Sequence, residues 1–139
     1  MNQRLNDHHE SCVLAQSGDT PAAARRFVVS ALEHWGVRDD FDDLPLVTSE
    51  LVTNAVRHAA SDVVVSIDLS SSCVRVEVSD VSPKVPLLGA LDVAHDGGWG
   101  LHIVEQLSTR WGLEPRLPGK TVWCELARPA GLQVSSDLP

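Results

Sequence analysis

The sequence lacks the features of several other protein classes. It has no apolar run long enough to cross a membrane, and its start is too polar for a secretory signal peptide. Its three cysteines are odd in number and far apart, without the spacing of a metal site or a disulfide framework. Internal repeats and low-complexity tracts are also missing. These absences predict a cytoplasmic protein with reduced thiols and no membrane partner.

Positive charge is scarce as well. The chain has 11 Lys and Arg against 19 Asp and Glu, which gives a net charge of −8 at pH 7, and no basic cluster is present that would follow a phosphate backbone. We therefore expect no nucleic-acid partner. A length of 139 residues suits one domain that buries roughly two thirds of its unfolded surface.

Familiar catalytic signatures are absent too. The six histidines form no His-Glu-x-x-His pattern, and there is no Gly-x-Ser-x-Gly elbow. The tripeptide 119–121 imitates the end of a P-loop, but Glu114 stands where that motif needs its first glycine. Residues 98–100 imitate a dinucleotide fingerprint, but Ile103 occupies the third glycine position. We therefore assign neither a P-loop nor a dinucleotide-binding fingerprint.

The hydrophobic pattern predicts an α+β fold. A helix is expected to start with Thr20 as N-cap and Pro21 as its first residue, because threonine caps helices and proline fits the first turn. Alternating apolar residues predict strands joined by short hairpin links. We expect a two-layer sandwich in which helices cover one face of a mixed, mostly antiparallel sheet. In numbers, the prediction is a flexible N-terminus 1–9, a domain 10–128 and a flexible tail 129–139, with strands 10–16, 63–69, 73–80, 113–117 and 121–127 and a long loop 81–96. The predicted helices are one from 20 to about 35, one that follows the acidic stretch 39–43 and continues to 60, and one that opens at 97–100 with an apolar stripe of Leu101, Val104, Leu107 and Trp111.

The first candidate site lies in the middle helix. Glu50 and Asn54 are four residues apart, so a helix places them on one face, about 5–6 Å apart at Cβ. A carboxylate and an amide at that spacing suit a proton acceptor beside a divalent ion, because Mg²⁺ takes few protein oxygens and completes its shell with water and phosphate. The alternative is an ordinary polar helix edge. His58 and Arg57 follow one turn later, as phosphate contacts or as helix-edge residues.

Two further candidate site segments follow the middle helix in the sequence. Asp80 shares strand parity with the apolar residues Val74, Val76 and Val78, so an acid points toward the buried side and needs hydrogen-bond donors there. Gly98 and Gly100 then open an amphipathic helix, where open backbone N–H groups and the helix dipole attract an anion.

This ordered set resembles the GHKL (Bergerat-fold, histidine-kinase-like) ATPase superfamily, and within it the anti-sigma-factor serine/threonine protein kinases, over residues 10–128. The resemblance implies ATP and Mg²⁺ as cofactors. It makes Glu50 the general base, Asn54 the Mg²⁺ ligand and Asp80 the acceptor for the adenine amino group. The phosphate glycines implied by the resemblance are Gly98 and Gly100, followed by Leu101.

The chain departs from the family pattern at the loop after Asp80. Ser82 and Lys84 stand where the family has glycines, and Pro83 stiffens the loop. Lys84 is a candidate phosphate contact, with a solvated loop lysine as the alternative. Thr121 resembles the threonine that helps to hold adenine, although its strand parity is opposite to that of the buried residues.

Two functional hypotheses follow. In the first, the protein is an ATP-dependent serine/threonine kinase that phosphorylates an anti-anti-sigma (STAS-type) protein and binds a sigma factor. In the second, the same fold is a nucleotide-responsive or nucleotide-free binding module without catalysis. The resemblance also implies a homodimer, with Trp123 on the outer parity of its strand as a candidate interface residue.

Overall fold

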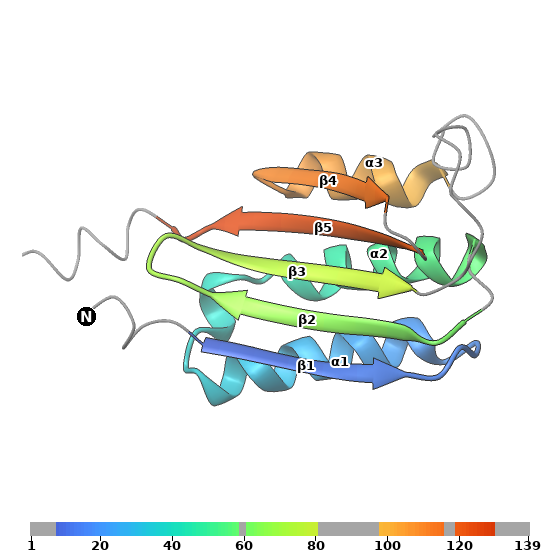
Figure 1. Cartoon of the computed structure of the whole chain (residues 1–139). Helices are drawn as coiled ribbons and strands as arrows, with labels where there is room; N and C mark the ends of the chain where they lie inside the picture. Colours follow the sequence, from blue (N-terminus) through green and yellow to red (C-terminus); the bar gives the residue numbers. More distant parts are fainter. Residues whose placement is uncertain (1–7, 59–60, 81–97, 116–118, 130–139) are drawn as a thin grey trace, which may run out of the picture.

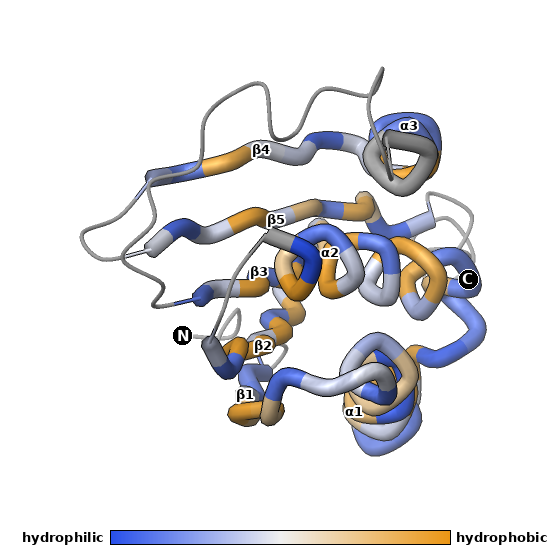
Figure 2. Tube along the Cα trace, turned by 90° about the vertical axis from the view of Figure 1, so that its right-hand side faces the viewer, coloured by the Kyte–Doolittle hydropathy of each residue, from blue (hydrophilic) through white to orange (hydrophobic). Residues whose placement is uncertain are grey.

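The computed structural model describes residues 8–58, 61–80, 98–115 and 119–129. In this part of the chain, five strands form one sheet in the order β1-β2-β3-β5-β4, and every neighbouring pair is antiparallel. Helices cover one face of this sheet and leave the other face open (Figure 1, Figure 2). The expected two-layer α+β fold is confirmed, and no parallel pair occurs among the described strands. The strands are β1 (His8–Leu14), β2 (Val63–Leu69), β3 (Cys73–Asp80), β4 (Arg110–Pro115) and β5 (Lys120–Ala127).

The helical layer consists, in the described residues, of α1 (Thr20–His34), the short 3₁₀ helix η2 (Arg38–Asp40), α2 (Leu44–His58) and α3 (Gly98–Leu107). The helix α2 contacts α1 and α3 as well as strands β2, β3 and β5. It therefore lies in the middle of the layer, as Figure 2 shows. Residues on α2 that face the sheet are consequently buried.

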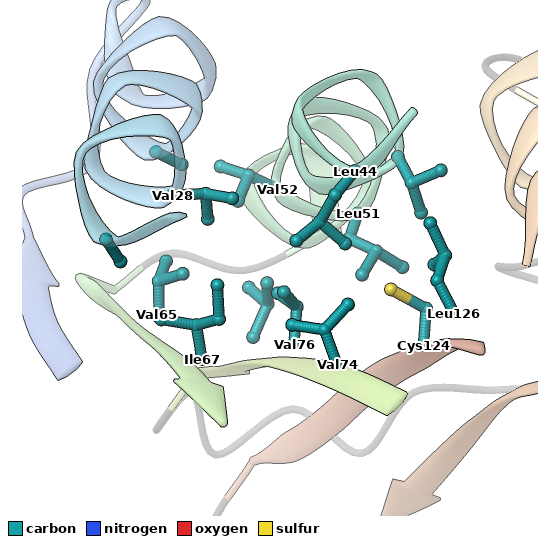
Figure 3. Packing of buried hydrophobic residues seen from close by; sticks show 14 of the residues in the cluster. Val28, Leu44, Leu51, Val52, Val65, Ile67, Val74, Val76, Cys124 and Leu126 are labelled. Carbon is teal, nitrogen blue, oxygen red and sulfur yellow. The ribbon is translucent and has the colours of Figure 1, made fainter. Parts of the chain in front are cut away.

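Strand alternation builds the core. In β2 and β3 every second side chain is buried, and the apolar members of this set pack against the inner faces of α1 and α2 (Figure 3). Burying a side chain such as Leu51 or Ile67 stabilises the fold by roughly 1.5–3 kcal/mol each. The same alternation carries the last residue of β3, Asp80, into the buried layer.

The first helix starts in a slightly different way from the prediction. Asp19 is the N-cap residue and Thr20 is already helical. The Thr20 hydroxyl donates to the Ala15 carbonyl oxygen at 2.7 Å, and it also accepts from the Ser17 backbone N–H at 2.8 Å, so it ties the helix to the preceding loop instead of capping the first turn. Gly36, at a φ of 73°, follows the helix end, a conformation that favours glycine.

The third helix is shorter than predicted. It ends at Leu107, and Trp111, which we had placed on its apolar stripe, lies in β4. The reason is a tertiary contact: the Thr109 backbone N–H donates to the Glu125 carbonyl oxygen of β5 at 2.8 Å, so the chain leaves the helix and joins the sheet edge. The strand β4 therefore starts at Arg110, before the predicted residue 113. At the other edge, β1 begins at His8, two residues earlier than predicted.

Some predictions lie outside the described residues. These include the loop 81–96 with Ser82 and Lys84, and the tail beyond residue 129. The backbone of His58 and of residues 98–101 is described as helical, but their side chains are not. None of the described helices is long and apolar enough to cross a membrane.

Candidate functional site

The predicted acid–amide pair lies on α2 as expected from the helix spacing. Asn54 is 7 % exposed, and Glu50, one turn earlier, is half-buried. Within the described residues, the Glu50 carboxylate makes no hydrogen bond or ion pair. A carboxylate that is partly withdrawn from water and left unpaired is able to accept a proton from a bound molecule.

Asn54 has an unsatisfied carbonyl oxygen. Its Oδ1 atom is buried and has no hydrogen-bond partner among the described residues. Two hydroxyls on α2 are paired, because Ser49 Oγ donates to the Leu46 carbonyl oxygen at 2.9 Å and Thr53 Oγ1 donates to the Ser49 carbonyl oxygen at 2.7 Å. The hydroxyl of Thr48, like Asn54 Oδ1, has no partner among the described residues. Buried polar atoms are almost always paired, so an orphaned oxygen indicates a missing partner. An amide oxygen is also a suitable ligand for Mg²⁺.

Asp80 is held by a lysine from the neighbouring strand. Asp80 ends β3 and Lys120 begins β5, and the two residues are partners in the strand register. Lys120 Nζ donates to Asp80 Oδ2 at 2.7 Å, and the two side chains are only 3 % and 1 % exposed, respectively. The expectation that Asp80 needs hydrogen-bond donors on the buried side is therefore met, and one of these donors is Lys120 of the protein itself.

The first turn of α3 contains the two predicted phosphate glycines. The helix begins at Gly98, so the amides of Gly98 and Gly100 belong to the turn whose N–H groups have no partner within a helix. These amides and the helix dipole together favour an anion. The predicted contact Leu101 lies in the same turn.

These segments meet at one end of the molecule. In Figure 1 the tip of β3, the start of β5, the second half of α2 and the start of α3 all lie at the right-hand end. The antiparallel register of β3 and β5 explains why the end of one strand adjoins the beginning of the other. The helix α2 contacts all three of the other elements. Residues from four distant parts of the sequence are thus brought to a common region.

Thr121 lies on a different face from the other predicted residues. Its hydroxyl is 2.8 Å from that of its register partner Ser79, and strand alternation directs both away from the helical layer that contains Asp80 and Lys120. Thr121 is completely buried nevertheless. Its predicted role at the base stays a prediction.

Two of the described cysteines, Cys12 and Cys124, do not provide a nucleophile. Burial raises the pKa of the Cys124 thiol to about 12, and hydrogen bonds to Val76 and Ser108 offset this only in part. Burial also raises the pKa of Cys12. Thiolate chemistry at neutral pH needs a lowered pKa, so these two thiols are structural. The described residues also contain no group of three or more His, Cys, Asp or Glu side chains that could hold a metal.

The open face of the sheet carries a charged network around Trp123. The Arg75 guanidinium lies 4.1 Å from the centroid of the Trp123 ring, and Glu125 accepts hydrogen bonds from Arg75 and Arg110 at 2.8 Å each. Trp123 is half-buried and covers Gly112 of β4. Its predicted role in a homodimer stays a prediction.

Comparison with known proteins agrees with this arrangement. The family model for the histidine kinase-like ATPase domain matches residues 15–125, which include α2, the end of β3, α3 and most of β5. The chain belongs to the histidine kinase-like ATPase family. Nucleotide binding is the property that this family membership implies, and the resemblance noted from the three motif segments is confirmed.

Two known proteins are similar to this chain. The chain is 33 % identical over 88 residues to the uncharacterized protein SCO4941 of Streptomyces coelicolor, and the aligned part covers 60 % of this chain and 81 % of that protein. It also resembles the crystal structure of the RsbU and RsbW domains of Rv1364c from Mycobacterium tuberculosis, with a TM-score of 0.65 and 22 % identity over 88 % of this chain. The match spans 33 % of the Rv1364c chain, so the likeness concerns the fold of one part of that protein.

Sequence reasoning about the ATPase domain missed the role of Lys120. We had considered this residue only as part of a false P-loop and of the turn between the last two predicted strands. A signal was available, because Lys120 has the same strand parity as the buried residues Val122 and Cys124. Its partner depended on the register of β5 against β3, which the sequence does not specify.

Proposed function

We propose that this domain binds ATP with Mg²⁺ and acts as an anti-sigma-factor serine/threonine kinase. The observation that carries the proposal is the buried Oδ1 of Asn54, which has no partner among the described residues and lies one helical turn from the carboxylate of Glu50. Membership of the histidine kinase-like ATPase family supports nucleotide binding at this place. The RsbW domain named in the similar structure is in keeping with the regulatory class.

The residues fit the cofactors. Asn54 would hold Mg²⁺ through Oδ1, and the ion would neutralise charge on the phosphates when bound; the other ligands would be phosphate oxygens and water, as is usual for this ion. The amides at the start of α3 bind phosphate oxygens. Asp80 accepts a hydrogen bond from the base.

In the proposed reaction, a serine or threonine hydroxyl of the substrate attacks the γ-phosphorus of ATP. The bond between this phosphorus and the β–γ bridging oxygen breaks, ADP leaves, and Glu50 accepts the hydroxyl proton. The substrate we propose is an anti-anti-sigma (STAS-type) protein, and the alternative partner is a sigma factor. Both partners follow from the resemblance.

A second candidate function is a binding module that does not turn nucleotide over. The observation that favours it is the Asp80–Lys120 ion pair, which satisfies part of the acid without any ligand. Under this alternative the fold sequesters a partner protein, and nucleotide is bound without turnover or not bound at all.

Two substitutions on α2 test the kinase. Asn54→Ala should weaken Mg²⁺-dependent ATP binding and phosphotransfer together, because it removes the metal ligand. Glu50→Ala should leave ATP affinity nearly unchanged and slow phosphotransfer by about 10²–10⁴-fold, the usual effect of losing a general base. Calorimetric titration of Mg-ATP and transfer of radiolabelled phosphate to an anti-anti-sigma partner measure the two properties.

Thr48→Val is the matched control, since Thr48 also lies on α2, its buried hydroxyl has no partner among the described residues, and it has no proposed role in the site. Thr48→Val should keep the Mg-ATP affinity and the phosphotransfer rate of the parent protein. Unchanged phosphotransfer in Glu50→Ala would remove the base assignment. A parent protein that binds Mg-ATP but never phosphorylates a matched partner would support the binding module instead.

A further inference from the structure

The exposed side of α1 borders a groove that is separate from the candidate nucleotide site. The groove lies where α1 packs against the start of α2, and its volume is about 360 Å³. Figure 2 shows the two helices side by side in the helical layer. Two apolar residues line the groove, Val29, which is half-buried, and Pro45, which is buried, together with three exposed arginines, Arg25, Arg26 and Arg38.

Positive charge is concentrated in this groove. Three of the 11 Lys and Arg residues of the chain line it against one acid, Glu33, so its described lining has a net charge of +2, although the whole chain has −8. Arg38 donates to Glu33 at 3.3 Å, and both side chains are so exposed that this pair contributes little to stability. Arg25 and Arg26 make no ion pair or side-chain hydrogen bond with other described residues. Their guanidinium groups are therefore available to carboxylates of another molecule.

An acidic hollow adjoins the groove. Glu33 and Arg38 line both, and Asp39 and Asp40 are further lining residues of the hollow. The surface thus changes from positive to negative where the two meet. An isolated anion matches only the groove, and a nucleic acid, which is negative along its whole length, is repelled by the hollow and by the net charge of the chain. A polypeptide segment with acidic residues followed by basic ones matches both parts.

The groove also specifies the side chains that such a segment carries. Each arginine offers a planar set of donors that binds a carboxylate through two parallel hydrogen bonds. Val29 and Pro45 offer apolar surface in the same groove, which favours an apolar side chain beside the acids. We propose that this groove is a docking surface for a partner protein, and that it takes a segment with acidic residues beside an apolar one, followed by basic residues. None of the described residues that line the groove belongs to the candidate nucleotide site, so this docking surface goes beyond both proposed functions and is compatible with either.

A fluorescently labelled peptide tests the proposal without knowledge of the natural partner. The probe is a short peptide in which glutamates alternate with leucines and lysines follow. Fluorescence anisotropy should show that the full chain binds it, although the net charge of −8 opposes the glutamates. Arg25→Glu and Arg26→Glu should each weaken this binding by about tenfold, because a repelling charge replaces an attracting one. Arg128→Glu is the matched control, since it changes the net charge by the same amount outside the groove, and it should alter the affinity by less than about twofold.

The outcomes are separate from those of the nucleotide experiments. Arg25→Glu and Arg26→Glu should leave the titration with Mg-ATP unchanged, and circular dichroism shows whether they are folded. A changed titration would overturn the separation of the two sites. No binding of the peptide at millimolar concentration, or an equal loss of affinity in Arg26→Glu and Arg128→Glu, would overturn the docking surface. Binding of inorganic phosphate or duplex DNA, with the same dependence on Arg25 and Arg26 and without binding of the peptide, would overturn it as well.

Discussion

At the scale of single residues, α2 contains two buried oxygen atoms without partners in the described structure, Thr48 Oγ1 and Asn54 Oδ1. An unsatisfied buried polar group costs about 1–3 kcal/mol of folding free energy. Functional sites often retain such a cost because the group is needed by a ligand. Asn54 has this explanation in the proposed site, while nothing in the structure explains the unpaired hydroxyl of Thr48.

Stability measurements distinguish a functional Asn54 from a structural one. Without nucleotide, Asn54→Ala should leave the free energy of unfolding unchanged or raise it by up to about 1 kcal/mol, because it removes the unpaired oxygen and alanine favours the helix. Urea unfolding of the parent protein and variant measures this. Thr48→Val should behave in the same way. A loss of more than about 1 kcal/mol in Asn54→Ala alone would show that Asn54 supports the fold.

At the scale of elements, the pairing of β4 with β5 depends on a close approach. A Cβ atom added to Gly112 would lie 2.8 Å from a carbon of the Trp123 ring, closer than real contacts allow. Glycine is therefore required where the ring crosses the edge strand. Arg75 on β3 packs on the same ring, so this contact links three neighbouring strands.

Gly112→Ala should consequently destabilise the protein by about 1–3 kcal/mol, the usual range for overpacking. The matched control is Gly18→Ala, because a Cβ atom at Gly18 meets nothing within 4 Å. Urea unfolding followed by circular dichroism measures both. If the clash with the ring is the cause, Trp123→Ala should remove most of the additional effect in the double variant. Equal stability of Gly112→Ala and Gly18→Ala would contradict the packing argument.

At the scale of the whole molecule, one face of the sheet is covered by helices, and the open face is stabilised by charge. Glu125 on β5 joins Arg75 of β3 and Arg110 of β4. Partial burial by itself raises the pKa of Glu125, but the hydrogen bonds from Arg110 and Arg75 outweigh this and lower it below its ordinary value of 4.5. Burial by itself lowers the pKa of Arg75, but the hydrogen bonds that Arg75 donates to Glu125 and to Glu77, two residues along β3, outweigh this and raise it.

This network makes the free energy of unfolding depend on pH in the acidic range. Because the folded pKa of Glu125 lies below the unfolded one, its contribution is complete above about pH 4.5 and is lost as the pH falls through the folded pKa. Urea unfolding between pH 7 and pH 3 should show a shallower decline for Glu125→Gln than for the parent protein. Glu33→Gln is the control, since Glu33 pairs with Arg38 on an exposed surface where ion pairs contribute little. Parallel curves for Glu125→Gln and the parent protein would contradict the role of the network.

The sequence by itself determined the features that depend on local spacing. Helix geometry alone puts Glu50 and Asn54 on one face, and strand alternation alone directs Asp80 toward the buried layer. The pairing of Lys120 with Asp80, the early start of β4 and the crossing of Trp123 over Gly112 were decided only by the tertiary structure. Each of these contacts depends on which residues of two strands become partners, and that register is set when the whole sheet closes on its helices.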